Sequence, residues 1–151
     1  MEILGIAGSL RRGSHNRKLL RAAGAELPPG VALRAWEGLR ELPPFDEDLE
    51  SAPPAAVHDF REAIEAADAV LIATPEYNAS IPGVLKNALD WASRPFPDNA
   101  LRNKPAAVIG ASTGLFGAVW AQAEARKTLK AIGAHVLETC LLYTSPSPRD
   151  S

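Results

Sequence analysis

The stretch Gly8-Ser9-Leu10-Arg11-Arg12-Gly13-Ser14-His15-Asn16 follows directly on the apolar residues 2–7. A short apolar run that leads into a glycine and a serine is typical of a buried strand followed by a turn. Ser14 is a suitable N-cap for a helix over 15–27, because its hydroxyl can accept a hydrogen bond from the first helical turn. The stretch is therefore predicted to connect a first strand to a first helix.

The same alternation continues along the chain. Further strands are predicted at 31–36, 69–74, 106–111 and from 135 to 142, and further helices at 55–67, 82–93 and 116–132. Strands that are unbroken apolar runs and that alternate with helices indicate a parallel sheet covered on both faces. The Pro-rich acidic segment 38–54 is predicted to be a loop, and its length suggests a functional or interface role.

Composition narrows the classes of protein. The chain has 151 residues, enough for one domain, and its formal net charge of −2 gives no basic excess for a nucleic-acid partner. Cys140 is the single cysteine, so neither an internal disulfide nor a cysteine-based zinc cluster is expected. No apolar run approaches the ~18 residues of a transmembrane helix. No basic leader precedes the first strand, so we expect a cytoplasmic protein without a membrane partner.

In an open α/β sheet the ligand site lies beyond the carboxyl ends of the strands. Three predicted loops with unusual residues leave those ends, at 8–16, 75–78 and 112–117. The first loop offers the hydroxyls of Ser9 and Ser14 and the amide of Asn16. It also offers a helix N-terminus, which favours a phosphate. Capping of the helix by Ser14 and Asn16 is the simpler alternative, but it explains Ser14 alone and not Ser9, Arg11 and Asn16 together.

The first loop differs from two known phosphate-binding motifs. It lacks the Gly-Lys-Ser/Thr of a P-loop, and glycines at 5, 8 and 13 do not form the dinucleotide fingerprint. Glu37, after the second predicted strand, is a candidate for the ribose-binding acid of a nucleotide-binding domain, which is one alternative hypothesis.

The other two loops are less specific. Pro75-Glu76-Tyr77-Asn78 can bind the polar edge of a flat heterocycle with Tyr77 stacked nearby, or it can be an ordinary turn. Trp91 on the third predicted helix is interpreted as a core or subunit-interface residue. The histidines have no partner at metal-ligand spacing, and no acid–base constellation can be assembled, which favours chemistry carried by a cofactor.

Four segments in the same order resemble the NADPH-dependent FMN reductase family, which includes quinone and chromate reductases. They are Gly8-Ser9-Leu10-Arg11-x-Gly13-Ser14-x-Asn16, Thr74-Pro75-Glu76-Tyr77-Asn78, Pro82-Gly83-x-Leu85-Lys86-Asn87-Ala88-x-Asp90-Trp91 and the strand leading to Ser112. The resemblance covers about residues 1–140. It implies a flavodoxin-like fold, a five-stranded parallel sheet of order 2-1-3-4-5 between helices, with noncovalently bound FMN.

The resemblance also implies roles for individual residues. Those that would hold the FMN phosphate are Ser9, Arg11, Ser14 and Asn16. Those that would cradle the isoalloxazine ring, largely through backbone atoms, are Pro75, Glu76, Tyr77 and Asn78. Those that would border the ring from the next loop are Ser112, Thr113 and Gly114. No protein side chain is implied as catalytic and no metal is expected, because the flavin carries the chemistry.

The implied activity is that of an NAD(P)H-dependent FMN reductase or quinone reductase. A hydride would pass from NADPH or NADH through the flavin to a small-molecule acceptor, which is a quinone, a flavin, an azo compound or a metal oxyanion. The family suggests a homodimer or homotetramer with the third helix at the interface. The alternative is a flavin-binding electron carrier or redox-sensing protein without turnover. Candidates for the extra phosphate of NADPH are Arg12, Arg94 and Lys104.

The end of the chain does not follow this pattern. Residues 141–151 have no helical periodicity and resemble nothing at that place in the family, so they are interpreted as a non-native or disordered tail. The flavodoxin-like FMN-binding domain is then residues 1–140, with its last helix missing. Right-handed crossovers place that helix beside the first one, so part of one sheet face is expected to be uncovered.

Overall fold

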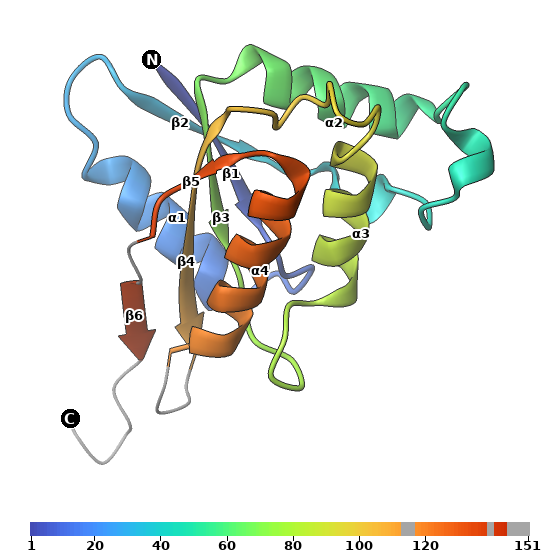
Figure 1. Cartoon of the computed structure of the whole chain (residues 1–151). Helices are drawn as coiled ribbons and strands as arrows, with labels where there is room; N and C mark the ends of the chain where they lie inside the picture. Colours follow the sequence, from blue (N-terminus) through green and yellow to red (C-terminus); the bar gives the residue numbers. More distant parts are fainter. Residues whose placement is uncertain (113–116, 139–140, 145–151) are drawn as a thin grey trace.

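A computed structural model describes residues 1–112, 117–138 and 141–144, the last four by their backbone alone. Its centre is one parallel sheet (Figure 1). The strands are β1 (Glu2–Ala7), β2 (Ala32–Trp36), β3 (Ala69–Ala73), β4 (Pro105–Ser112), β5 (His135–Val136) and β6 (Leu141–Thr144). Their order is β2-β1-β3-β4-β5, so the predicted flavodoxin-like order is confirmed.

The fifth position of the sheet is shared by two short strands. β5 pairs with Pro105 and Ala106 at the start of β4, and β6 pairs with 109–112 at its end. Both pairings are parallel. The predicted strand from 135 is thus two segments, and β6 lies within the stretch that the sequence assigns to the tail. Residues 145–151 of that tail lie outside the described part of the chain.

Helices lie on both faces of the sheet (Figure 1). They are α1 (His15–Ala25), α2 (Ala55–Ala66), α3 (Gly83–Ala92) and α4 (Val119–Ile132), with 3₁₀ turns η1 (Gly38–Glu41) and η2 (Glu47–Leu49) in the acidic loop. α4 begins three residues later than predicted, because Gly117 and Ala118 have φ angles of 55° and 62° and cannot continue a right-handed helix. The helix ends as predicted at Gly133, whose φ is 111°.

The two faces of the sheet are buried unequally. The face under α2, α3 and α4 holds the larger core, in which Phe60, Ile72 and Trp91 are fully buried. On the α1 face the buried cluster is small, and Leu33 and Leu71 are only half-buried. Between α4 and Thr144 the described residues form strands and no helix. Among the described residues, the α1 face is therefore the less buried of the two.

The acidic loop is tied to α3 by two side chains of the third family motif. Asn87 Nδ2 donates to the carbonyl oxygen of Pro43 at 2.9 Å, and its Oδ1 accepts from the Phe45 amide at 2.7 Å. Trp91 Nε1 donates to the same Pro43 oxygen at 2.7 Å. The assignment of Trp91 to the core is confirmed, and its indole also holds this loop against the helix.

Candidate functional site

The three predicted loops leave neighbouring strands at the carboxyl edge of the sheet. The Gly8 amide donates to the carbonyl of Ala73 at 2.8 Å, and the Thr74 amide donates to that of Ile109 at 3.0 Å. A Cβ atom on Gly8 would lie 3.1 Å from Leu85 Cδ2 and 3.5 Å from Pro75 Cδ. Glycine at position 8 therefore lets the first loop lie close against Leu85 of α3, with the second loop in ordinary contact.

The first loop wraps the N-terminus of α1. Ser14 Oγ accepts a hydrogen bond from the Asn16 amide at 3.2 Å, which confirms the predicted N-cap. Ser9 Oγ accepts from the Arg11 amide at 3.3 Å. Both serines are buried, whereas the side chain of Arg11 is exposed. The loop thus brings two hydroxyls to the positive end of a helix, with an exposed guanidinium group beside them.

Asn16 has a structural task that its sequence position did not suggest. Its Oδ1 accepts from the Ala111 amide at 3.0 Å, and its Nδ2 donates to the Ala111 carbonyl at 3.3 Å. The residue is 2% exposed. This paired contact fixes α1 to the end of β4.

The sequence around the first loop carries only positive charge. Residues 3–25 contain five lysines and arginines and no aspartate or glutamate. A Cβ atom on Gly13 would meet nothing within 4 Å, so the loop is open to solvent at that point. Basic side chains, serine hydroxyls and the positive end of α1 all favour an anion here.

The second loop is a tight turn. Tyr77 and Ser80 exchange backbone hydrogen bonds of 3.0 and 3.1 Å, and the two residues between them, Asn78 and Ala79, have φ angles of 55° and 61°. Two consecutive positive φ angles are typical of a type I′ turn, in which asparagine is favoured. The ordinary-turn alternative therefore describes the backbone correctly. The Tyr77 side chain is 51% exposed and remains free to stack on a flat ligand.

Glu76 joins the second loop to α4. Its Oε1 accepts from the Ala121 amide at 2.9 Å, in the first turn of that helix. The residue at the helix N-cap, Ala118, makes no side-chain cap. Glu76 therefore caps α4 from a different loop, a role that nothing in the local sequence signals.

The third loop is only partly described. Ser112 is half-buried at the end of β4, while Thr113 and Gly114 lie outside the described residues. From Gly117 the chain is described again, and the carbonyl of Gly117 accepts a hydrogen bond of 2.9 Å from Gln122 Nε2. Gly110 makes room for this arrangement, since a Cβ atom there would lie 3.0 Å from both Gln122 Nε2 and Ala118 Cβ. A glutamine inside a helix carries no signal of its own in sequence, so the role of Gln122 is visible only in the structure.

Residues 1–146 match the family model of the NADPH-dependent FMN reductases. The chain belongs to this family. It is 49% identical over 138 residues to an NAD(P)H-dependent FMN reductase of Pseudomonas aeruginosa, covering 91% of this chain and 74% of the relative. A quinone reductase of Pseudomonas putida is 46% identical over 125 residues, which are 82% of this chain and 67% of the relative. A quinone reductase of Escherichia coli K12 is 37% identical over 139 residues, which are 91% of this chain and 73% of the relative.

Solved structures agree with the fold. The flavoenzyme FerB of Paracoccus denitrificans, an NAD(P)H:acceptor oxidoreductase, superposes with a TM-score of 0.88 at 36% identity, covering 98% of this chain and 81% of that one. An NADH:FMN oxidoreductase in its apo form superposes with a TM-score of 0.72 at 24% identity, covering 95% and 75% of the two chains, and supports the fold alone.

The site residues fit an FMN molecule in its two polar regions. The open, acid-free loop at the N-terminus of α1 suits the phosphate, and the adjoining turn with exposed Tyr77 suits the edge and face of the ring. Among the described residues no group of histidine, cysteine, aspartate and glutamate could hold a metal ion. None of the helices in that part of the chain is long and apolar enough to cross a membrane.

Proposed function

We propose that this protein is an FMN-dependent NAD(P)H oxidoreductase. It passes a hydride from NAD(P)H through the flavin to a quinone, a flavin, an azo compound or a metal oxyanion. The observation that carries the proposal is that the first two loops and the end of β4 lie side by side at the carboxyl edge of the sheet, next to the acid-free N-terminus of α1. Family membership and the quinone reductases among the relatives support it.

Each loop has its own task in this proposal. Ser9, Arg11 and Ser14 bind the phosphate, and Asn16 adds one donor while it holds the loop against β4. Charge-assisted hydrogen bonds from the arginine and the helix N-terminus orient the ligand tightly.

The other two loops surround the ring. The backbone of 75–78 binds its polar edge, Tyr77 covers part of its face, and Ser112 with Thr113 and Gly114 borders it from the next strand. Bound flavin supplies the hydride chemistry, while the protein excludes water and positions the donor and the acceptor. No side chain has to act as an acid or a base.

We also propose that the protein is a homo-oligomer, a dimer or a tetramer, that acts in the cytoplasm. A cavity of about 510 Å³ lies between α3 and α4, lined in part by Phe96 and Ile132. Phe96 is 65% exposed, and an exposed aromatic ring beside an apolar hollow is typical of an interface. Light scattering on the purified protein tests the oligomeric state.

The activity is tested with purified protein and added FMN. Ultrafiltration and the flavin absorption spectrum show whether FMN is retained. The decrease in NADPH absorbance after addition of a quinone measures turnover. Arg11→Gln should weaken FMN binding about tenfold through the loss of one charge-assisted contact, whereas Arg34→Gln, on the surface beside Glu2, should not. Folded protein that retains no FMN would overturn the proposal. Bound FMN without NADPH oxidation would indicate the electron-carrier alternative.

A further inference from the structure

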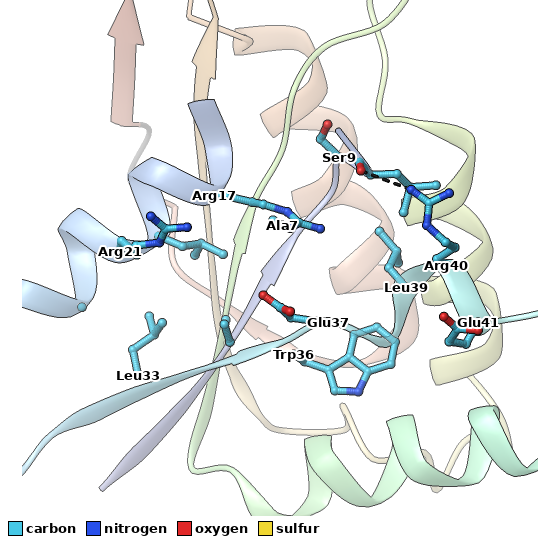
Figure 2. Close-up of a pocket in the computed structure, with 15 residues that line it drawn as sticks. Ala7, Ser9, Arg17, Arg21, Leu33, Trp36, Glu37, Leu39, Arg40 and Glu41 are labelled. Atoms are coloured by element: carbon cyan, nitrogen blue, oxygen red, sulfur yellow. Dashed lines mark hydrogen bonds between the residues drawn. The ribbon is translucent and has the colours of Figure 1, made fainter. Parts of the chain in front are cut away.

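A second pocket, of about 380 Å³, lies on the flank of α1 (Figure 2). It is formed between α1, β1, β2 and η1. Its apolar wall contains Leu20 of α1 and Leu33 of β2, and it reaches Ser9 and Leu10 of the first loop. A hollow of this size is large enough for a small organic ligand.

Opposite charges face this pocket from two elements. Arg17 and Arg21 reach it from α1, and Glu37 reaches it from the end of β2 (Figure 2). In the described part of the chain the side chains of these three residues make no ion pair or direct hydrogen bond. By contrast, Arg40 at the same pocket donates from Nη2 to the Leu10 carbonyl at 3.3 Å.

The two arginines are one helical turn apart. Like charges at this spacing repel each other and weaken a helix slightly. An anion between them removes the repulsion and gains charge-assisted hydrogen bonds from two guanidinium groups. Glu37 cannot hold a metal alone, but it can accept hydrogen bonds from hydroxyl groups. The pocket thus combines a phosphate-binding side, a hydroxyl-binding side and an apolar wall.

This pocket is separate from the proposed ring site. Its lining includes no residue of the turn at 75–80 and none of the described residues around β4 and α4. It shares only Ser9 and Leu10 with the first loop, so a ligand here would lie beside the FMN phosphate rather than in its place.

Two other candidates for the extra phosphate of NADPH are already engaged. Arg94 lies 3.5 Å from Glu47 and 3.4 Å from Glu50. Lys104 Nζ donates to the Ala67 carbonyl at 2.5 Å. Lys104 directly precedes β4, so it lies at the amino edge of the sheet, opposite the proposed site. Arg17 and Arg21 have neither of these restrictions.

We propose that the pocket between α1 and β2 binds the 2′-phosphoadenosine end of NADPH. Arg17 and Arg21 bind the phosphate, Glu37 accepts a hydrogen bond from a ribose hydroxyl, and the wall containing Leu20 and Leu33 contacts the base. The assignment rests on the proposed function, because it takes NADPH to be a substrate. It makes the α1 flank a determinant of the preference for NADPH over NADH.

Binding of nucleotide fragments tests the assignment without turnover. Isothermal titration is performed with adenosine 2′,5′-bisphosphate, 5′-AMP and inorganic phosphate, with and without excess FMN. The bisphosphate should bind in both conditions and more tightly than the other two. The double variant Arg17→Gln/Arg21→Gln should weaken it at least tenfold, the loss expected for charge-assisted contacts. Arg34→Gln is the matched control, since Arg34 is on the same strand as Leu33 but pairs with Glu2 at 2.8 Å.

The outcomes separate this assignment from the proposed function. If the double variant is folded by circular dichroism and binds the bisphosphate like the unaltered protein, the assignment is wrong. It is also wrong if excess FMN abolishes binding, because the fragment then occupies the first loop. Equal affinity for 5′-AMP would assign the pocket to a free mononucleotide instead. An unchanged KM for NADPH in the double variant overturns the assignment but leaves the reductase activity intact.

Discussion

Removal of the Glu76 side chain should destabilise the protein through α4. In the structure the carboxylate accepts a hydrogen bond of 2.9 Å from the Ala121 amide, and Ala118 offers no cap of its own. Glu76→Ala therefore removes both an acceptor and a negative charge from the positive end of the helix. Glu76→Gln keeps an acceptor oxygen and removes only the charge.

The expected loss follows from these two contributions. Replacing a capping side chain by alanine costs about 1 kcal/mol. A negative charge at a helix N-terminus contributes about 0.3–1 kcal/mol. Glu76→Ala should thus lower the free energy of unfolding by about 1–2 kcal/mol, and Glu76→Gln by about half of that. For a chain of this length the alanine variant should melt about 3–6 °C earlier.

Thermal unfolding followed by far-UV circular dichroism measures the effect, in the presence of excess FMN. The control is Glu124→Ala, which removes a carboxylate from α4 itself. Glu124 forms an exposed ion pair with Lys127 at 3.9 Å, and such a pair contributes little to stability. Because Glu76 also joins the second loop to α4, its alanine variant should bind FMN more weakly than the control does. The capping argument is wrong if Glu76→Ala has the same melting temperature as the unaltered protein. It is also wrong if Glu76→Gln is less stable than Glu76→Ala.

Three further predictions follow from other contacts. Asn16→Ala leaves two buried backbone groups without partners, so the free energy of unfolding in urea should fall by about 2–4 kcal/mol; a loss below 1 kcal/mol would contradict this. Trp91→Phe removes the indole hydrogen bond to Pro43 and should cost about 1–2 kcal/mol, together with faster hydrogen exchange in the acidic loop. The hydrogen bond from Lys130 lowers the pKa of Glu138 below its usual range, so Lys130→Gln should raise that pKa in an NMR titration. The lowered pKa means that this pair contributes stability at neutral pH, which is lost as the pH falls through the folded-state pKa of Glu138.

The N-cap of α1 and the positions of the strands could be predicted from sequence, because each depends on residues that are neighbours along the chain. Ser14 was predicted as the N-cap, and its hydroxyl does accept from the next turn. The strands were recognised because buried parallel strands are continuous apolar runs. The start of α4 was predicted three residues early, since neither Gly117 nor Ala118 reveals its positive φ angle in sequence. Glycine adopts positive and negative φ angles about equally, and alanine adopts a positive φ only rarely, so neither residue marks the end of the loop.

What the sequence determined by itself is the alternation of strands and helices, the order of the polar loops and the family. These follow from periodicity and from motifs whose members are neighbours along the chain. Only the tertiary structure decided the partners of Asn16 and Glu76, and that Arg17, Arg21 and Glu37 face one pocket. Those contacts join elements far apart in sequence. They depend on how strands register and on how helices pack across them, which no local pattern encodes.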